Sequence, residues 1–258
     1  MKILRYREHN EIHYGVLEDD GTINQLVGSP FEGLDTDGVF TNINKVTVLA
    51  PVPQPRLIGV GLNYAAHAAE GGKEPPPIPM LFMLPWTAVI GQGDQVVYPV
   101  QGQNIEYEGE LVVVIGKETK DVSEADALDH VLGYTCGNDI SERVIQRQEM
   151  SQGCMLMGKG FDTFKPMGPY IATDLDPTDL ELTTRLNGEI RQHTSTSDLI
   201  FPVAKLIEYI SDAITLLPGD VIYTGTPAGV GPVEPGDSVE VEIGGIGILK
   251  NTIVAEEA

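Results

Sequence analysis

The stretch from residue 105 to residue 116, IEYEGELVVVIG, constrains the fold more than any other part of the chain. Glu106, Glu108 and Glu110 alternate in it with uncharged residues, and successive side chains of a β-strand point to opposite faces. The three carboxylates are therefore expected on one face. Residues 111–115 are all apolar, which is typical of a strand that is buried on both faces.

Three carboxylates at the mouth of a buried strand repel one another. Burial makes this repulsion more costly unless a cation lies among them. A hard divalent ion with oxygen ligands, such as Mg²⁺ or Ca²⁺, would neutralise the charge. The same spacing is compatible with the solvated edge of a very acidic protein, so the spacing alone leaves both interpretations open.

The overall charge argues against one large class of partner. The 258 residues include 38 acidic and 16 basic side chains, for a formal net charge of −22. Binding to DNA or RNA is not expected, because phosphate contacts need clustered Lys and Arg. The acidic residues are spread along the chain, and dispersed surface charge keeps halophilic proteins soluble. A high-salt cytoplasm is therefore our hypothesis for the setting.

The N-terminal sequence, the lengths of the apolar runs and the two cysteines together predict a soluble cytoplasmic protein. The N-terminal sequence MKILRYREHN lacks the apolar core of a signal peptide. No apolar run reaches the roughly 18 residues that a membrane-spanning helix needs. Cys136 and Cys154 fit neither a disulfide framework nor the spacing of a zinc site.

The chain is expected to contain a small domain and a large one. Residues 1–50 predict a β meander, because alternating segments in them are separated by turn residues. A proline-rich joint then leads into a larger unit, residues 51–258. The larger unit shows many strand patterns and few helical ones, and the two do not alternate regularly. The expected fold class is mostly β with a few helices (α+β), the helices at residues 63–70, 123–131, 141–151 and 203–214.

Two glycine-rich segments imitate nucleotide-binding loops. Gly59 and Gly61 follow a predicted strand, but the third glycine of a dinucleotide fingerprint is missing at Tyr64. Residues 153–159 match the first seven positions of a phosphate loop, but Gly160 stands where Ser or Thr must hold Mg²⁺. Nucleotide binding is not expected at either segment.

Seven further segments occur in the order that one protein family shows. They are GLNYAAHAAE, EYEGELVVVIGK, GYTCGNDISERVIQ, GKGFDTFKPMGP, LNGEIRQ, PGDVIYTGTPAGVG and PGDSVEVEIGGIGILKN. Together they cover about residues 51–254, and over this span the sequence resembles the fumarylacetoacetate hydrolase superfamily. Within that superfamily the sequence resembles acylpyruvases and 2-hydroxyhepta-2,4-diene-1,7-dioate isomerases.

The resemblance implies a fold, a cofactor and a class of substrate. The fold is a mixed β-sandwich roll with a small N-terminal β domain, usually assembled as a homodimer. Members of the family bind Mg²⁺, Mn²⁺ or Ca²⁺ and act on small 2-oxo acids and their enols. The expected reaction is hydrolysis of a carbon–carbon bond in an acylpyruvate. Isomerisation of a dioate or decarboxylation of an oxo acid is the alternative, and a catalytically silent, metal-stabilised β scaffold is an alternative of another class.

The resemblance also implies roles for single residues. Metal binding falls on Glu108, Glu110 and Asp139, so Glu106 is not expected to be a ligand. Lys159 is expected to contact the substrate oxyanion or carboxylate, and His67 and Glu70 correspond to a catalytic pair on a flap helix. The remaining candidates are expected to bind substrate: Arg56, Asn63, Gln146 and Thr226.

Each of these residues also has a purely structural interpretation. Without the resemblance, His67 reads as a surface helix residue and Lys159 as a solvated loop lysine. Asp139 reads equally well as the N-cap of a helix that starts near residue 140. His67 and Glu70 are three residues apart, so on a helix they would share one face. In the catalytic interpretation, Glu70 orients His67, and His67 acts as a general base.

The charge balance generates a prediction about salt. Because like charges repel in dilute buffer and are screened at high ionic strength, the free energy of unfolding is expected to rise with salt. We expect the thermal midpoint to fall steadily from molar KCl to dilute buffer, measured by circular dichroism. A flat profile across this range would contradict the halophile hypothesis.

Overall fold

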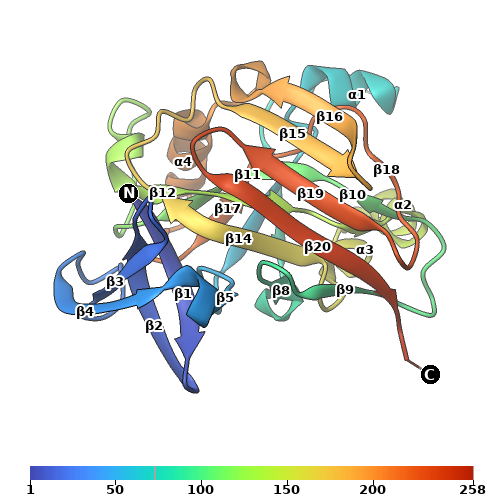
Figure 1. Ribbon diagram of the computed structural model, residues 1–258. Coiled ribbons are helices and arrows are strands. Elements are labelled where there is room, and N and C mark those ends of the chain that lie inside the picture. Colours follow the sequence, from blue (N-terminus) through green and yellow to red (C-terminus); the bar gives the residue numbers. More distant parts are fainter. Residues whose placement is uncertain (73, 258) are drawn as a thin grey trace.

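The computed structural model describes residues 1–72 and 74–257, and within them β-strands predominate (Figure 1). Three sheets carry the architecture, and the expected class of mostly β with a few helices is confirmed. The largest sheet has twelve strands and runs in the order β4-β3-β2-β1-β14-β12-β11-β17-β6-β7, with β5 paired to β1 and β8 to β14. Its strands are β1 (Lys2–Glu8), β2 (Glu11–Leu17), β3 (Thr22–Leu26), β4 (Thr36–Asn42), β5 (Thr47–Leu49), β6 (Leu57–Gly61), β7 (Met80–Leu84), β8 (Val89–Ile90), β11 (Gly109–Ile115), β12 (Val131–Asn138), β14 (Lys165–Ala172) and β17 (Val221–Tyr223).

Two smaller sheets and a set of short helices complete the described part of the chain. The five-stranded sheet consists of β9 (Gln95–Tyr98), β15 (Glu181–Leu186), β16 (Glu189–Ser195), β19 (Ser238–Ile243) and β20 (Gly247–Ala255). The three-stranded sheet consists of β10 (Ile105–Tyr107), β13 (Ser141–Glu142) and β18 (Gly231–Pro232). The helices are α1 (Ala65–Glu70), α2 (Arg143–Ser151), α3 (Met157–Gly160) and α4 (Val203–Ser211), with 3₁₀ turns η1 (Ile43–Lys45), η2 (Trp86–Ala88), η3 (Ala127–His130) and η4 (Thr196–Asp198).

Strand β11 lies at the centre and is buried on both faces, as its apolar run predicted. Leu111 and Val113 enter one core, which β19 and α4 cover. Val112 and Val114 enter a second core on the opposite face, against residues of β1, β14 and β17. The period of two therefore divides the side chains of one strand between two cores.

The glutamate stretch is not one continuous strand. It breaks at Glu108, where the chain leaves the three-stranded sheet that contains β10 and enters the large sheet through β11. Asn138 holds this break, because its side-chain oxygen accepts a hydrogen bond of 2.9 Å from the Glu108 N–H. The alternation of the three glutamates survives, since Glu106, Glu108 and Glu110 all line the same cavity.

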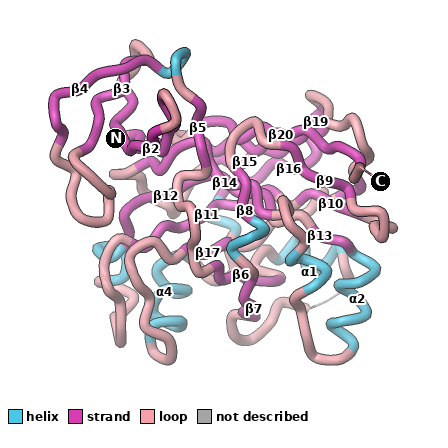
Figure 2. Tube along the Cα trace, turned by 90° about the horizontal axis from the view of Figure 1, so that it is seen from below, coloured by secondary structure: helices cyan, strands magenta, loops and turns pink. Residues whose placement is uncertain are grey.

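The N-terminal meander continues the sheet of the larger unit. Strand β1 pairs antiparallel with β14, so that Lys2 lies opposite Ala172 and Ile3 opposite Ile171. In both views the strands β1 to β4 lie at the end of the molecule away from α1 and α2 (Figures 1 and 2). The division at residue 50 into two domains stays a prediction.

Three of the four expected helices form, and one does not. Helices α1, α2 and α4 lie within the predicted ranges, whereas residues 123–131 contain only the turn η3. Ser123 does not cap a helix there, because its hydroxyl donates to the Asp126 carboxylate instead of accepting a backbone N–H. No helix in the described residues is long and apolar enough to span a membrane.

Candidate active site

A cavity of about 560 Å³ opens between the end of β6, helices α1, α2 and α3, the start of β11 and the loop after β17. Glu108 and Glu110 reach it from the break that begins β11, and Asp139 from the residue after β12. One oxygen from each of the three carboxylates lies within 4.8 Å of the other two, and all three side chains are buried. These are the three residues expected to hold a metal, drawn from segments about 30 residues apart in the chain.

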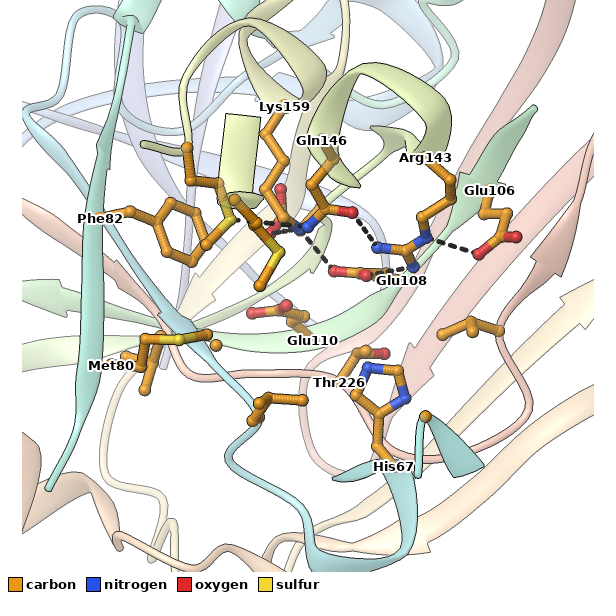
Figure 3. Close-up of a pocket in the computed structure, with 18 of the residues that line it drawn as sticks. His67, Met80, Phe82, Glu106, Glu108, Glu110, Arg143, Gln146, Lys159 and Thr226 are labelled. Atoms are coloured by element: carbon orange, nitrogen blue, oxygen red, sulfur yellow. Dashed lines mark hydrogen bonds and ion pairs between the residues drawn. The ribbon is translucent and has the colours of Figure 1, made fainter. Parts of the chain in front are cut away.

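Basic side chains lie among these carboxylates (Figure 3). The Lys159 ammonium donates to Glu108 Oε2 at 2.8 Å and to Asp139 Oδ2 at 2.5 Å. The Arg143 guanidinium binds both Glu108 and Glu106, the latter at 2.5 Å from Nε. Lys165, at the start of β14, lies 2.7 Å from Asp139 Oδ1 and donates to the carbonyl oxygens of Ile140 and Phe164.

The protonation of the centre follows from burial and from these neighbours. Burial alone would raise the pKa of Glu108, but the charges of Arg143 and Lys159 outweigh it and hold that pKa below its usual value. Burial raises the pKa of Glu110 well above its usual value, and repulsion from Asp139 and Glu108 adds to this. Glu110 therefore takes up a proton more readily than Glu108.

The pKa values of the two buried lysines, Lys159 and Lys165, are shifted in opposite directions. Burial opposes the charge of Lys159, but the attraction of Asp139 and Glu108 prevails and raises its pKa. Burial lowers the pKa of Lys165 to about 8, in spite of the neighbouring Asp139. Lys159 thus keeps a positive charge next to the carboxylates over the physiological range of pH.

The donor set of this group fits a metal ion. Asp139 Oδ1 is buried 2.7 Å from the Lys165 ammonium, and Asp139 Oδ2 accepts from Lys159, so two cations compensate the charge of this carboxylate. Three clustered, buried carboxylates are a donor set that Mg²⁺, Mn²⁺ or Ca²⁺ accepts.

The expected catalytic pair lies on α1 and lines the cavity. His67 Nδ1 lies 3.4 Å from Glu70 Oε2, a long contact, and the His67 side chain is 17% exposed. Glu70 also accepts from the backbone N–H of Gly229, at 3.2 and 3.3 Å, in the loop after β17. The loop after β17 therefore contacts the carboxylate that lies next to the imidazole.

Two of the four expected substrate-binding residues reach the cavity. Gln146 lines it from α2 and accepts a hydrogen bond of 2.8 Å from Arg143. Thr226 lines it from the glycine-rich loop, and its hydroxyl donates to the Gly109 carbonyl at 2.9 Å. Both are in place to contact a ligand.

The other two expected substrate-binding residues are not among those that line the cavity, and their role stays a prediction. Arg56 binds the Asp220 carboxylate and the Thr215 carbonyl. Asn63 is buried, and its amide bonds to the Phe201 backbone and to the Thr224 carbonyl. Neither is among the residues that line the cavity, because both side chains brace neighbouring loops.

Sequence reasoning missed several residues of the site. Arg143 precedes Gln146 by three positions on α2, and this spacing places both on one helix face. Lys165 gave no signal, since it occupies an otherwise apolar strand. The remaining missed residues that line the cavity are mostly apolar or methionine side chains: Val60, Leu62, Met80, Phe82, Arg147, Met150, Met155 and Val230.

The phosphate-loop match is a coincidence of sequence. The backbone N–H groups of Leu156, Met157 and Gly158 all donate to the Glu149 carboxylate, at 3.2, 2.7 and 2.9 Å. An acidic side chain thus occupies the place that a phosphate would need.

The family assignment follows from comparison with known proteins. Residues 56–254 match the family model described as fumarylacetoacetate (FAA) hydrolase, C-terminal, and residues 1–51 match the model Rv2993c-like, N-terminal. The chain belongs to the fumarylacetoacetate hydrolase family. Members of this family include hydrolases, isomerases and tautomerases, so family membership by itself leaves the reaction open.

Three relatives illustrate this range. A solved 5-carboxymethyl-2-hydroxymuconate delta-isomerase from Mycobacterium smegmatis is 42% identical, with a TM-score of 0.92 over 99% of this chain and 100% of the other. Oxaloacetate tautomerase FAHD2A of Bos taurus mitochondria is 40% identical over 82% of this chain and 70% of its own length. A fumarylpyruvate hydrolase from Pseudomonas aeruginosa, solved with Mn²⁺ and pyruvate, is 37% identical, with a TM-score of 0.76 over 81% of this chain and 92% of the other.

The raised pKa of Glu110 generates a prediction for the metal-free protein. A carboxyl group whose pKa is raised by folding stabilises the fold below its ordinary pKa, and this contribution is lost as pH rises through the raised value. Glu110→Gln, which stays neutral, is therefore expected to raise the free energy of unfolding at pH 8 by about 1 to 3 kcal/mol, and much less at pH 5.

Urea unfolding in EDTA at both pH values measures this effect. Glu234→Gln is the matched control, because Glu234 is exposed and outside the cavity. If Glu110→Gln changes stability equally at pH 5 and pH 8, Glu110 is not the strained carboxylate of the group.

Proposed function

We propose that the chain is a divalent-metal-dependent enzyme that hydrolyses a carbon–carbon bond of an acylpyruvate, a 2,4-dioxo acid. The observation that carries this proposal is the meeting of Glu108, Glu110 and Asp139 beside the Lys159 ammonium in one cavity. The relative named fumarylpyruvate hydrolase, which holds Mn²⁺ and pyruvate, supports the same chemistry.

Glu108, Glu110 and Asp139 would hold the ion. We propose Mg²⁺, with Mn²⁺ or Ca²⁺ as alternatives, because all three prefer carboxylate oxygens. When bound, such an ion supplies a Lewis acid that stabilises negative charge on an enolate oxygen.

The basic and polar side chains of the cavity would bind the pyruvyl end of the substrate. Lys159 keeps its proton and lies beside the same carboxylates, so it places a positive charge where an oxyanion develops. Gln146 and Thr226 line the same space and can donate or accept hydrogen bonds to the substrate carboxylate.

The pair on α1 would activate water. With Nδ1–H directed at Glu70, the second ring nitrogen of His67 is free to accept a proton from water. The hydroxide then adds to the acyl carbonyl carbon, and the bond to the neighbouring CH₂ breaks. The electron pair of that bond passes to the pyruvate fragment as an enolate, which His67 protonates at carbon, so that the products are a carboxylic acid and pyruvate.

Isomerisation or decarboxylation of a 2-oxo acid is the second candidate. The close similarity to a delta-isomerase and to an oxaloacetate tautomerase favours it. These reactions need a proton shuttle but no attack by water, and His67 with Glu70 can provide one. A catalytically silent scaffold is the third candidate and needs only the metal site.

The assembly and setting stay proposals. We propose a homodimer in a high-salt cytoplasm that acts on a small 2-oxo acid. Light scattering coupled to size exclusion in molar KCl measures the assembly directly.

Titration of the metal distinguishes an enzyme from a scaffold. Oxalate resembles the enolate of pyruvate, so an enolate-stabilising site is expected to bind Mg²⁺ at least about tenfold more tightly in its presence. Isothermal titration calorimetry measures Mg²⁺ affinity with and without oxalate. A scaffold gains no affinity from oxalate, and Glu110→Gln is expected to abolish the coupling.

Removal of the imidazole tests the role of the flap pair. His67→Ala is expected to lower kcat for acylpyruvate hydrolysis at least about tenfold, because general base catalysis is lost, while the Mg²⁺–oxalate coupling persists. His193→Ala is the control, since His193 is exposed on β16 and outside the cavity. An unchanged kcat in His67→Ala removes His67 from the mechanism.

A further inference from the structure

The cavity has a charged side and an apolar side. The carboxylates, Lys159 and Arg143 lie together, and Phe82 and Met80 lie beyond them on the side away from Arg143 (Figure 3). Met150 and Met155 also line the cavity, and all four of these apolar side chains are partly buried. We call Met80, Phe82, Met150 and Met155 the thioether wall.

Two glycines make room for half of this wall. Strands β6 and β7 pair antiparallel, with Gly59 opposite Phe82 and Gly61 opposite Met80. A Cβ atom on Gly59 would lie 2.3 Å from the Phe82 ring, and one on Gly61 would lie 2.2 Å from Met80 Cε. The two side chains therefore lie across the backbone of β6, which only glycine permits at such close range. These are the glycines that imitate a dinucleotide loop in the sequence.

The wall adjoins the groups that would hold the reacting end of the substrate. Gln146 Nε2 donates to Met155 Sδ at 3.5 Å, so a single residue contacts both sides of the cavity. The Lys159 ammonium lies 5.4 Å from the centre of the Phe82 ring. A ligand held at Lys159 would thus extend directly onto the wall.

Charge decides what kind of group the wall accepts. Among the described residues that line the cavity, the buried cations are Arg143 and Lys159, and both are bound to carboxylates. A second substrate carboxylate on the wall would lose its water without gaining a buried cation, and the acidic centre would repel it. A hydrocarbon group would instead gain from burial against methionine and phenylalanine.

We propose that the thioether wall is a binding site for an uncharged alkyl or aryl acyl group. The preferred substrate is then a monocarboxylic acylpyruvate with an apolar tail, not a dioate. This inference rests on the proposed function, because it assumes that the pyruvyl end lies at Lys159. Arg147, exposed at the edge of the cavity, is the cation that a dioate would use instead.

A series of substrates tests the inference. We expect kcat/KM to rise from acetylpyruvate to hexanoylpyruvate by about fourfold for each methylene that becomes buried. Fumarylpyruvate, which carries a second carboxylate, is expected to react more slowly than hexanoylpyruvate. A flat series would overturn the inference. A preference for fumarylpyruvate that Arg147→Gln abolishes would also overturn it, in favour of a dioate substrate.

Methionine variants test whether the thioether wall causes the preference for an apolar acyl group. Met80→Gln keeps the length of the side chain but makes it polar, and we expect it to lower the hexanoylpyruvate to acetylpyruvate ratio of kcat/KM at least about fivefold. Met83→Gln is the matched control, because Met83 lies on the same strand, is exposed and does not line the cavity. Equal ratios in the two variants overturn the role of the wall.

A binding measurement separates this inference from the proposed function. Oxamate and N-hexyl oxamate present the same 2-oxo acid group, and calorimetry in Mg²⁺ compares their affinities without turnover. We expect the hexyl compound to bind at least about tenfold more tightly. If both bind equally, the wall is not an acyl site although the proposed function stands. If oxamate does not bind and acylpyruvates are not cleaved, the proposed function fails as well.

Discussion

The structure depends on a buried cluster in which acidic and basic side chains compensate one another. Glu108, Glu110 and Asp139 are packed within a few ångströms of each other, and without Lys159, Lys165 and Arg143 their repulsion in a medium of low polarity would force them apart or neutralise them. The compensation is incomplete at Glu110, whose pKa stays high. A centre that holds carboxylates together while one of them still resists ionisation is prepared for an additional cation.

The surrounding fold supports this cluster with rigid elements. Strand β11 packs between two hydrophobic cores. The break in the strand at Glu108 lies where the glutamates enter the cavity. Lys159 and Gln146 come from α3 and α2, which pack against each other, and the Glu149 carboxylate binds the backbone between them. By contrast, His67 and Glu70 lie on a helix of six residues, which a loop from β17 holds through Gly229. The proposed metal ligands and the proposed water-activating pair thus lie on separate parts of the structure.

Local sequence patterns predicted the acidic part of the site. The alternation of glutamates and the apolar run 111–115 indicated a buried strand with acids on one face, and both features are present. The roles of Gln146, Lys159 and Thr226 were identified only through the resemblance, since an isolated lysine or threonine carries no signal of its own. Arg56 and Asn63 were also expected to bind substrate, but they are not among the residues that line the cavity. Their residue types fit either role, and only their contacts with Asp220 and Thr224 show that they brace loops.

The sequence by itself determined the strand-rich class, the family and the identity of the three clustered acids, because these depend on short periodic patterns and on ordered motifs. The tertiary structure alone decided which cations neutralise those acids and what the cavity offers beyond them. Lys165 reaches Asp139 across two neighbouring strands, and Met80 and Phe82 reach the cavity because two glycines stand opposite them on β6. Such contacts join residues far apart in the chain, and the pairing of strands that creates them is a property of the whole fold.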